Sequence, residues 1–183
     1  MITLRPHQTD TVNAMWGNSK GQIIVPTGGG KTMCMIDDAL LYLTGRFKTV
    51  VVVAPRILLA EQLSSEFLDI IQKKYQFINV LHVHSGETHH FSTTNADEIR
   101  EWDKVNGNKI IFTTYHSLHR LIEANIDVDV IYFDEAHNSV QKNFIEAVEY
   151  YSMYANRCYF FTATPKHSKT PFKIGMNDED IFG

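Results

Sequence analysis

The chain has few cysteines, no long apolar run and no excess of positive charge. Its two cysteines, Cys34 and Cys158, lack the paired spacing of a zinc site, which suits a reduced intracellular setting. No apolar stretch approaches the roughly 20 residues that a membrane helix needs, and the N-terminus shows no signal-peptide pattern. We therefore expect a cytoplasmic protein.

The charge balance also restricts the ways in which the protein can bind a partner. Lysine and arginine number 17 against 21 aspartate and glutamate residues, which gives a formal net charge of −4. The sequence thus lacks the overall basic character of proteins that bind nucleic acid through charge alone, so any such contact must be local. With 183 residues, of which 44% are hydrophobic, one sizeable core is expected rather than two ordinary α/β domains.

Short runs rich in β-branched residues alternate with helical patterns. The four consecutive valines from Val50 to Val53 are typical of a strand that is covered on both faces in a parallel sheet. We predict strands over 22–26, 49–54, 78–84, 109–114, 129–134 and 158–162, and helices over 6–17, 31–45, 57–74, 95–105, 115–124 and 138–151. This order predicts a doubly wound α/β fold, a three-layer sandwich around a mostly parallel sheet of about six or seven strands, with ligands at the carboxyl ends of the strands.

A glycine loop follows the first predicted strand. Its backbone N–H groups, with the N-terminus of the next helix, can approach phosphates closely and favour negative charge. Lys31 would pair with the β- and γ-phosphates, and the Thr32 hydroxyl would bind Mg²⁺. Val25 stands where the strict motif has its first glycine, and a glycine turn without a ligand is the alternative. The residues predicted to contact the nucleotide here are Thr27, Gly28, Gly29, Gly30, Lys31 and Thr32.

An acidic motif, Asp134-Glu135-Ala136-His137, follows directly after the apolar run 130–133. Buried carboxylates are costly unless they are paired or bind a metal, so two at the end of a buried strand need an explanation. We predict that Asp134 holds magnesium, usually through water, and that Glu135 orients the attacking water. Alternatively, Asp134 only caps the following helix. The glycine loop and the acidic motif together predict a domain that hydrolyses ATP.

With both motifs in place, residues 1–166 resemble the first RecA-like domain of superfamily-2 helicases and translocases. The resemblance implies that Gln8, with Arg5 beside it, reads adenine, and that His137 links the nucleotide site to the coupling residues Thr162 and Thr164. It also implies contacts to the nucleic-acid backbone from two motifs and one loop residue, namely Pro55, Arg56, Gln62, Gly86, Thr113, Thr114 and His116.

The sequences of these motifs resemble those of the DNA-directed branch of the superfamily, which includes restriction-enzyme motor subunits and repair, recombination or phage helicases. An RNA helicase of the same superfamily and a non-catalytic, nucleotide-dependent interaction module are the alternatives. The resemblance implies a bacterial or phage-infected cell, ATP and Mg²⁺ as cofactors, and a second RecA-like domain in a longer chain. Residues 167–183 would then be a linker toward that domain, with an acidic, solvated end at 177–180.

Some of the singled-out residues also have simpler interpretations. Arg5 and Gln8 are alternatively surface residues at a helix start, and Thr113 and Thr114 an ordinary helix cap. The histidines around residues 82–90 suggest a metal site, but no cysteine or carboxylate set accompanies them, so we favour a structural role.

Overall fold

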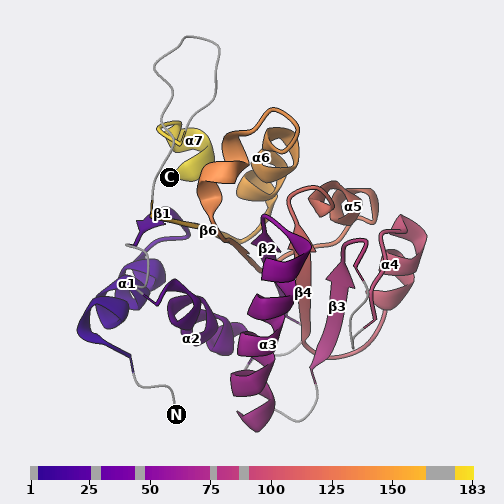
Figure 1. Cartoon of the computed structure of the whole chain (residues 1–183), viewed down its shortest axis with the longest axis horizontal. Helices are drawn as coiled ribbons and strands as arrows, with labels where there is room; N and C mark the ends of the chain where they lie inside the picture. The colour runs from indigo at the N-terminus through magenta and orange to yellow at the C-terminus, as the bar shows by residue number, and fades with distance from the viewer. Residues whose placement is uncertain (1–3, 26–29, 44–47, 75–77, 87–90, 164–175) are drawn as a thin grey trace.

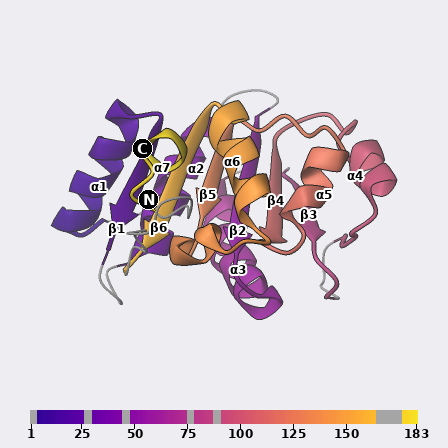
Figure 2. The same ribbon diagram turned by 90° about the horizontal axis from the view of Figure 1, so that it is seen from above.

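Six parallel strands form one sheet in the order β1-β6-β5-β2-β4-β3 (Figure 1). The computed structural model describes residues 4–25, 30–43, 48–74, 78–86, 91–163 and 176–183. The strands are β1 (Lys20–Ile24), β2 (Thr49–Ala54), β3 (Asn79–Val83), β4 (Lys109–Thr114), β5 (Val130–Phe133) and β6 (Arg157–Thr162). Figure 2 shows β1 and β3 at opposite edges of the sheet.

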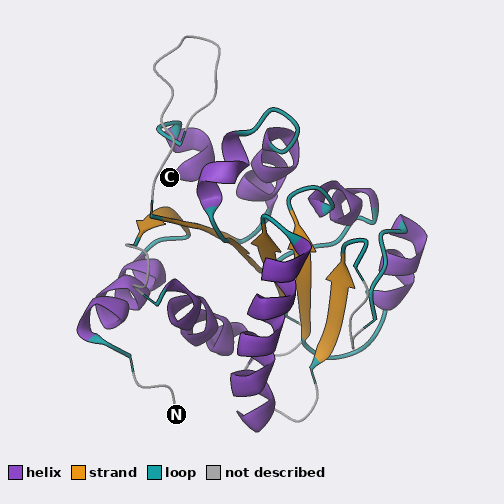
Figure 3. Cartoon of the chain, in the orientation of Figure 1, coloured by secondary structure: helices purple, strands orange, loops and turns teal. Residues whose placement is uncertain are grey.

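Helices cover both faces of this sheet (Figure 3). One face packs against α1 (Pro6–Gly17), α2 (Lys31–Leu43) and α3 (Ile57–Lys74). The other face packs against α4 (Ala96–Trp102), α5 (Leu118–Glu123), α6 (Ile145–Tyr154) and α7 (Glu179–Phe182). The predicted three-layer α/β fold is therefore confirmed. Among the described helices, none combines the length and the apolar character that crossing a membrane requires.

The alternation of side chains along each strand divides the core into two parts. In β2, Val51 and Val53 enter the core under α4 to α7, whereas Val50 and Val52 enter the core under α1 to α3. Successive side chains of a strand point to opposite faces, so a strand buried on both faces must be apolar at every position. This is why the valine run predicts β2 with the bounds that the structure has.

The segment after the acidic motif differs from the single helix predicted over 138–151. A 3₁₀ helix, η1 (Ala136–Val140), comes first, and α6 begins only at Ile145. Glu135, directly before η1, has the left-handed backbone angles φ 47° and ψ 54°. The chain thus turns sharply at the end of β5, and a short 3₁₀ segment connects this turn to the residues before α6.

The C-terminal acidic stretch at 177–180 is largely exposed, as expected, but the residues after it are not. Asp178 caps α7 by accepting the backbone N–H of Asp180 at 3.1 Å, and the apolar residues Ile181 and Phe182 are buried. The Phe182 ring lies 4.6 Å from that of Phe160 on β6. The four polar residues at 177–180 therefore precede an apolar pair that completes the core, which the acidic composition of this stretch concealed.

Candidate active site

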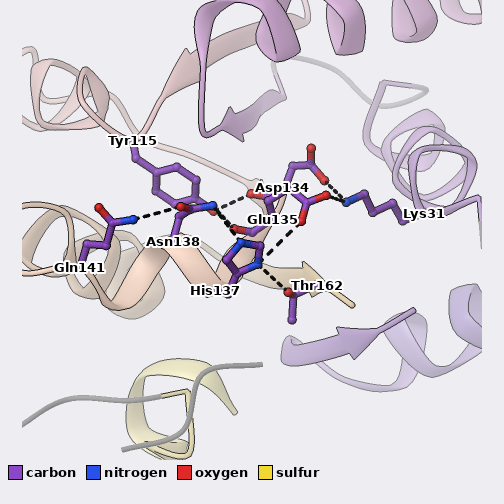
Figure 4. Close-up of polar contacts among 8 residues, drawn as sticks. All are labelled: Lys31, Tyr115, Asp134, Glu135, His137, Asn138, Gln141 and Thr162. Atoms are coloured by element: carbon purple, nitrogen blue, oxygen red, sulfur yellow. Dashed lines mark hydrogen bonds and ion pairs between the residues drawn. The ribbon is translucent and has the colours of Figure 1, made fainter. Parts of the chain in front are cut away.

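Lys31 and the acidic motif meet at the carboxyl ends of the strands, as Figure 4 shows. Lys31 is the first residue of α2, and Asp134 directly follows β5. Lys31 Nζ lies 3.1 Å from Asp134 Oδ1 and also donates a hydrogen bond to Glu135 Oε1. One lysine thus contacts two carboxylates that lie more than 100 residues further along the chain.

The left-handed turn at Glu135 makes this double contact feasible. Neighbouring side chains of a regular strand point to opposite faces, so Asp134 and Glu135 could not both reach Lys31 if β5 continued. A non-glycine residue with positive φ is strained by about 1–3 kcal/mol. The Asn138 backbone N–H and side-chain Nδ2 both donate to the Glu135 carbonyl, at 3.0 and 2.9 Å, and hold this turn in place.

Burial sets the electrostatics of the cluster. The Asp134 side chain is only 6% exposed, and this burial raises the pKa of its carboxyl despite the nearby Lys31 charge. Burial also acts to lower the pKa of Lys31, but Asp134 and Glu135 outweigh it and raise that pKa above its usual 10.5. The lysine therefore stays charged and compensates a carboxylate in a poorly hydrated place.

Asp134 retains an unsatisfied oxygen that fits a role as a metal ligand. Its buried Oδ1 has no hydrogen-bond donor among the described residues, because the contact to Lys31 has the distance of an ion pair but not the geometry of a hydrogen bond. Thr32 follows Lys31 in the first turn of α2. The described part of the chain holds no group of three His, Cys, Asp or Glu side chains placed for a metal. A cation here would therefore complete its ligand shell from phosphate and water.

His137 connects the acidic motif to β6. Its Nδ1 lies 3.0 Å from Thr162 Oγ1 and 3.7 Å from Glu135 Oε2. Thr162 is buried at the end of β6, beside β5 in the sheet. The other predicted coupling residue, Thr164, lies outside the described residues. His137 thus contacts both a residue of the acidic motif and the strand that leads into the second coupling position.

The predicted adenine reader lies against the glycine loop. Gln8 is buried, its Nε2 donates to the Gly30 carbonyl at 3.0 Å, and its Oε1 accepts the Arg5 N–H at 2.8 Å. Gly30 has φ +75°, a backbone conformation that favours glycine, and a Cβ there would displace the ends of the Gln8 and Arg5 side chains. The remaining loop residues of the prediction, Thr27, Gly28 and Gly29, lie outside the described residues.

A polar groove of about 380 Å³ extends from the acidic motif. Three of the predicted nucleic-acid contacts line it, namely Pro55, Arg56 and His116. Its other lining residues are Leu59, Glu135, His137, Asn138, Gln141 and Phe144. Asn138 and Gln141 were not predicted as site residues. The sequence feature that could have indicated them is their position shortly after the acidic motif. Nucleic-acid candidates and the acidic motif therefore share one surface depression.

Four other predicted nucleic-acid contacts lie elsewhere. Thr113 is fully buried and its hydroxyl donates to the Val83 carbonyl at 2.8 Å, while Thr114 is also buried. The Thr113 hydroxyl is thus bonded inside the sheet, and both side chains are buried in this structure, so their contact with nucleic acid stays a prediction. Gln62 is exposed on α3, and Gly86 follows β3, but neither lines the groove.

His82 on β3 and His84 directly after it form a buried hydrogen-bonded chain. His84 Nδ1 accepts a backbone N–H at 3.0 Å, His84 Nε2 lies 3.1 Å from His82 Nδ1, and His82 Nε2 lies 2.9 Å from Ser64 Oγ. Each ring nitrogen thus has a hydrogen-bonding partner within the protein, as the structural interpretation predicts. His89 and His90 lie outside the described residues.

Tyr115, which directly follows β4, holds the backbone of the acidic motif. Its hydroxyl donates to the Asp134 carbonyl at 2.7 Å, and its ring stacks on Phe133 and Phe144. The backbone that carries the carboxylates is therefore fixed from β4 as well as from β2, where the Val53 carbonyl accepts the Asp134 N–H at 2.8 Å.

Comparison with known proteins identifies the family of this arrangement. Residues 1–167 match the family model described as type III restriction enzyme, res subunit. The chain belongs to this family. The family and the RecA-like fold together show that the chain is an ATP-binding motor domain of the superfamily-2 helicase and translocase type. No curated protein matches the sequence.

Solved structures of low sequence identity share the fold. A nuclease-deletion mutant of the type ISP restriction-modification enzyme LlaGI, in complex with a DNA substrate mimic, is 22% identical with a TM-score of 0.72, over 100% of this chain and 19% of that one. LlaBIII, an ATP-dependent type ISP enzyme bound to DNA, is 21% identical with a TM-score of 0.77, over 100% and 14%. The Hef helicase domain of Pyrococcus furiosus is 21% identical with a TM-score of 0.65, over 91% and 34%. The chain thus spans between 14% and 34% of the length of these three proteins.

Proposed function

We propose that this chain is the ATP-binding half of a DNA translocase or helicase, which couples Mg-ATP hydrolysis to movement along nucleic acid. The observation that carries the proposal is the convergence of Lys31, Asp134 and Glu135 at the carboxyl ends of the sheet. Ligands of open α/β sheets bind at this end of the strands. A non-catalytic interaction module would not need a second carboxylate beside the phosphate site.

In this proposal each residue of the cluster has a separate task. Lys31 would release the carboxylates of Asp134 and Glu135 and bind the β- and γ-phosphates instead. Thr32 and Asp134 would hold magnesium. The metal would neutralise phosphate charge. Glu135 orients and polarises the attacking water, a task that suits a carboxylate that is 34% exposed and borders the groove. The buried Oδ1 of Asp134, which accepts no hydrogen bond from the described residues, supports the assignment of the metal.

The groove supports a nucleic-acid path next to the hydrolysis site. Arg56 is exposed and can contact a backbone phosphate, and His116 lies across the same depression. The relatives LlaGI and LlaBIII are described with a DNA substrate mimic and with DNA, which favours DNA over RNA for this chain. Because Glu135 and His137 line the same groove, a ligand there would be sensed directly by the acidic motif.

We further propose that residues 1–166 form the first RecA-like domain and that 167–183 lead toward a second one in a longer chain. That domain would supply the transition-state arginine, which is worth about 10³–10⁵ in rate for this chemistry. The 183-residue chain alone should therefore hydrolyse ATP only feebly.

A malachite-green phosphate assay with and without single-stranded or forked DNA tests this proposal. We expect very slow turnover by the chain alone, and DNA-stimulated turnover by a longer chain that includes a second RecA-like domain. Lys31→Ala in the longer chain should abolish that turnover, and unchanged turnover would remove the proposed phosphate site. Robust DNA-stimulated turnover by the 183-residue chain would contradict the need for a second domain, and stimulation by RNA alone would contradict the DNA assignment.

A further inference from the structure

A second polar contact joins α2 to β5 inside the core. The Tyr132 hydroxyl on β5 donates a hydrogen bond to Asp38 Oδ2 on α2. Asp38 is 1% exposed and Tyr132 is completely buried. The Tyr132 ring also stacks on Tyr159 of β6 at 6.1 Å, so the hydroxyl is held in a fixed direction. No role in phosphate, metal or nucleic-acid binding accounts for this buried carboxylate.

The position of this contact relates it to the active site. Asp38 follows Lys31 by seven residues in α2, which places both on the same helix face about 10 Å apart. Tyr132 precedes Asp134 by two residues, which places both on the same side of the strand path about 7 Å apart. The Lys31–Asp134 and Asp38–Tyr132 contacts therefore connect the same helix and strand at two successive levels.

Stability alone does not explain a carboxylate at this place. Burial raises the pKa of Asp38 to about 6, against the hydrogen bond from Tyr132 and the charge of Arg157. Replacing buried ionic groups by apolar residues of similar volume often leaves a protein equally stable or more stable. Met35, Ala39 and Phe161 belong to the apolar cluster on this face of the sheet. The polar groups that interact with Asp38 besides Tyr132 are those of Asp37, Tyr42, Arg157 and Tyr159.

We propose that the Asp38–Tyr132 hydrogen bond is a positioning contact, which fixes α2 along β5 and so holds Lys31 opposite Asp134 and Glu135. Apolar contacts are non-directional and tolerate a small sliding of the helix, whereas a hydrogen bond is lost within a few tenths of an ångström. Lys31 begins α2, so any shift of the helix axis moves its ammonium directly. The inference rests on the proposed binding of nucleotide phosphates by Lys31.

The test uses Asp38→Leu combined with Tyr132→Phe, which replaces the polar pair by an apolar one. We measure the Kd of a fluorescent, non-hydrolysable ATP analogue with Mg²⁺, together with the thermal unfolding temperature. The expected result is an unchanged or higher unfolding temperature and an affinity about tenfold lower, equivalent to weakening one charged hydrogen bond. Asp38→Asn should retain nearly wild-type affinity, because the amide oxygen still accepts the Tyr132 hydroxyl.

Matched variants separate this role from a general effect on folding. Tyr151→Phe removes a buried tyrosine hydroxyl from the other helix layer, where it donates to the Ile126 carbonyl at 3.3 Å, and should leave the affinity unchanged. If the double variant does not fold, Tyr132→Phe alone decides, with a several-fold loss of affinity expected. A folded variant without the hydrogen bond that binds like wild type would overturn the inference. Absence of binding by the wild type would instead overturn the proposed function, and this inference with it.

Discussion

Asp134 and Glu135 are neighbours in sequence but occupy different environments. Asp134 is buried with an unsatisfied oxygen, while Glu135 is partly exposed and borders the groove. The sequence could predict two adjacent carboxylates at the end of a buried strand, because four apolar residues precede them. It could not predict the left-handed backbone at Glu135, since this conformation depends on the two hydrogen bonds from Asn138.

The shifted pKa values of two buried residues should make the free energy of unfolding depend on pH. Burial lowers the pKa of His84 below its usual 6.5, so the unfolded state binds more protons near that pH. The stability that neutral His84 retains above pH 6.5 is lost as the pH falls. Burial raises the pKa of Asp38 from 3.8 to about 6, so the folded state binds more protons between these values. Protonated Asp38 therefore adds to the free energy of unfolding at low pH, and this contribution is lost as the pH rises through about 6.

Urea unfolding of the wild type, His84→Gln and Asp38→Asn between pH 4.5 and pH 7.5 tests both signs. Relative to the wild type, His84→Gln should make the slope of unfolding free energy against pH more negative, and Asp38→Asn should make it more positive. Each change should be at most about 1 kcal/mol per pH unit. Slopes that shift in the same direction would show that one of the two groups does not titrate as its burial requires.

The most predictable elements were strands that are buried on both faces and two of the helices that cover the sheet. The bounds of β2, β4, α1 and α3 match those predicted, because the apolar pattern that defines them is local. The region from Glu135 to Phe144 was not predictable in the same way. Its path depends on the local contact of Asn138 with Glu135 and on the packing of Phe144 against Tyr115, a residue from a distant part of the sequence.

Removing the hydrogen bond between the Tyr115 hydroxyl and the Asp134 carbonyl should lower the stability of the protein. Tyr115→Phe leaves the buried Asp134 carbonyl without its hydroxyl donor, which should lower the free energy of unfolding by about 1–3 kcal/mol. Tyr154→Phe is the matched control, because Tyr154 is 68% exposed and such changes stay within about 0.5 kcal/mol. Urea unfolding of both variants measures the difference. Equal stability of the two variants would remove the Tyr115 contact as a support of the acidic motif.

The whole molecule brings together residues that are 104 positions apart in the sequence, Lys31 and Glu135. This convergence was predictable, because all strands of a parallel sheet end at one edge and both motifs directly follow strands. Burial of Thr113 and the docking of α7 were not predictable, since they depend on which side chains the neighbouring elements satisfy or cover.

Isothermal titration calorimetry with a non-hydrolysable ATP analogue tests the central claim most directly. The account predicts that the wild-type chain binds the analogue, that chelating Mg²⁺ weakens binding, and that Lys31→Ala abolishes it. Glu135→Gln should still bind, because its carboxylate acts on water rather than on the nucleotide. Binding by Lys31→Ala with wild-type affinity would contradict the claim that this lysine and the acidic motif form one nucleotide site.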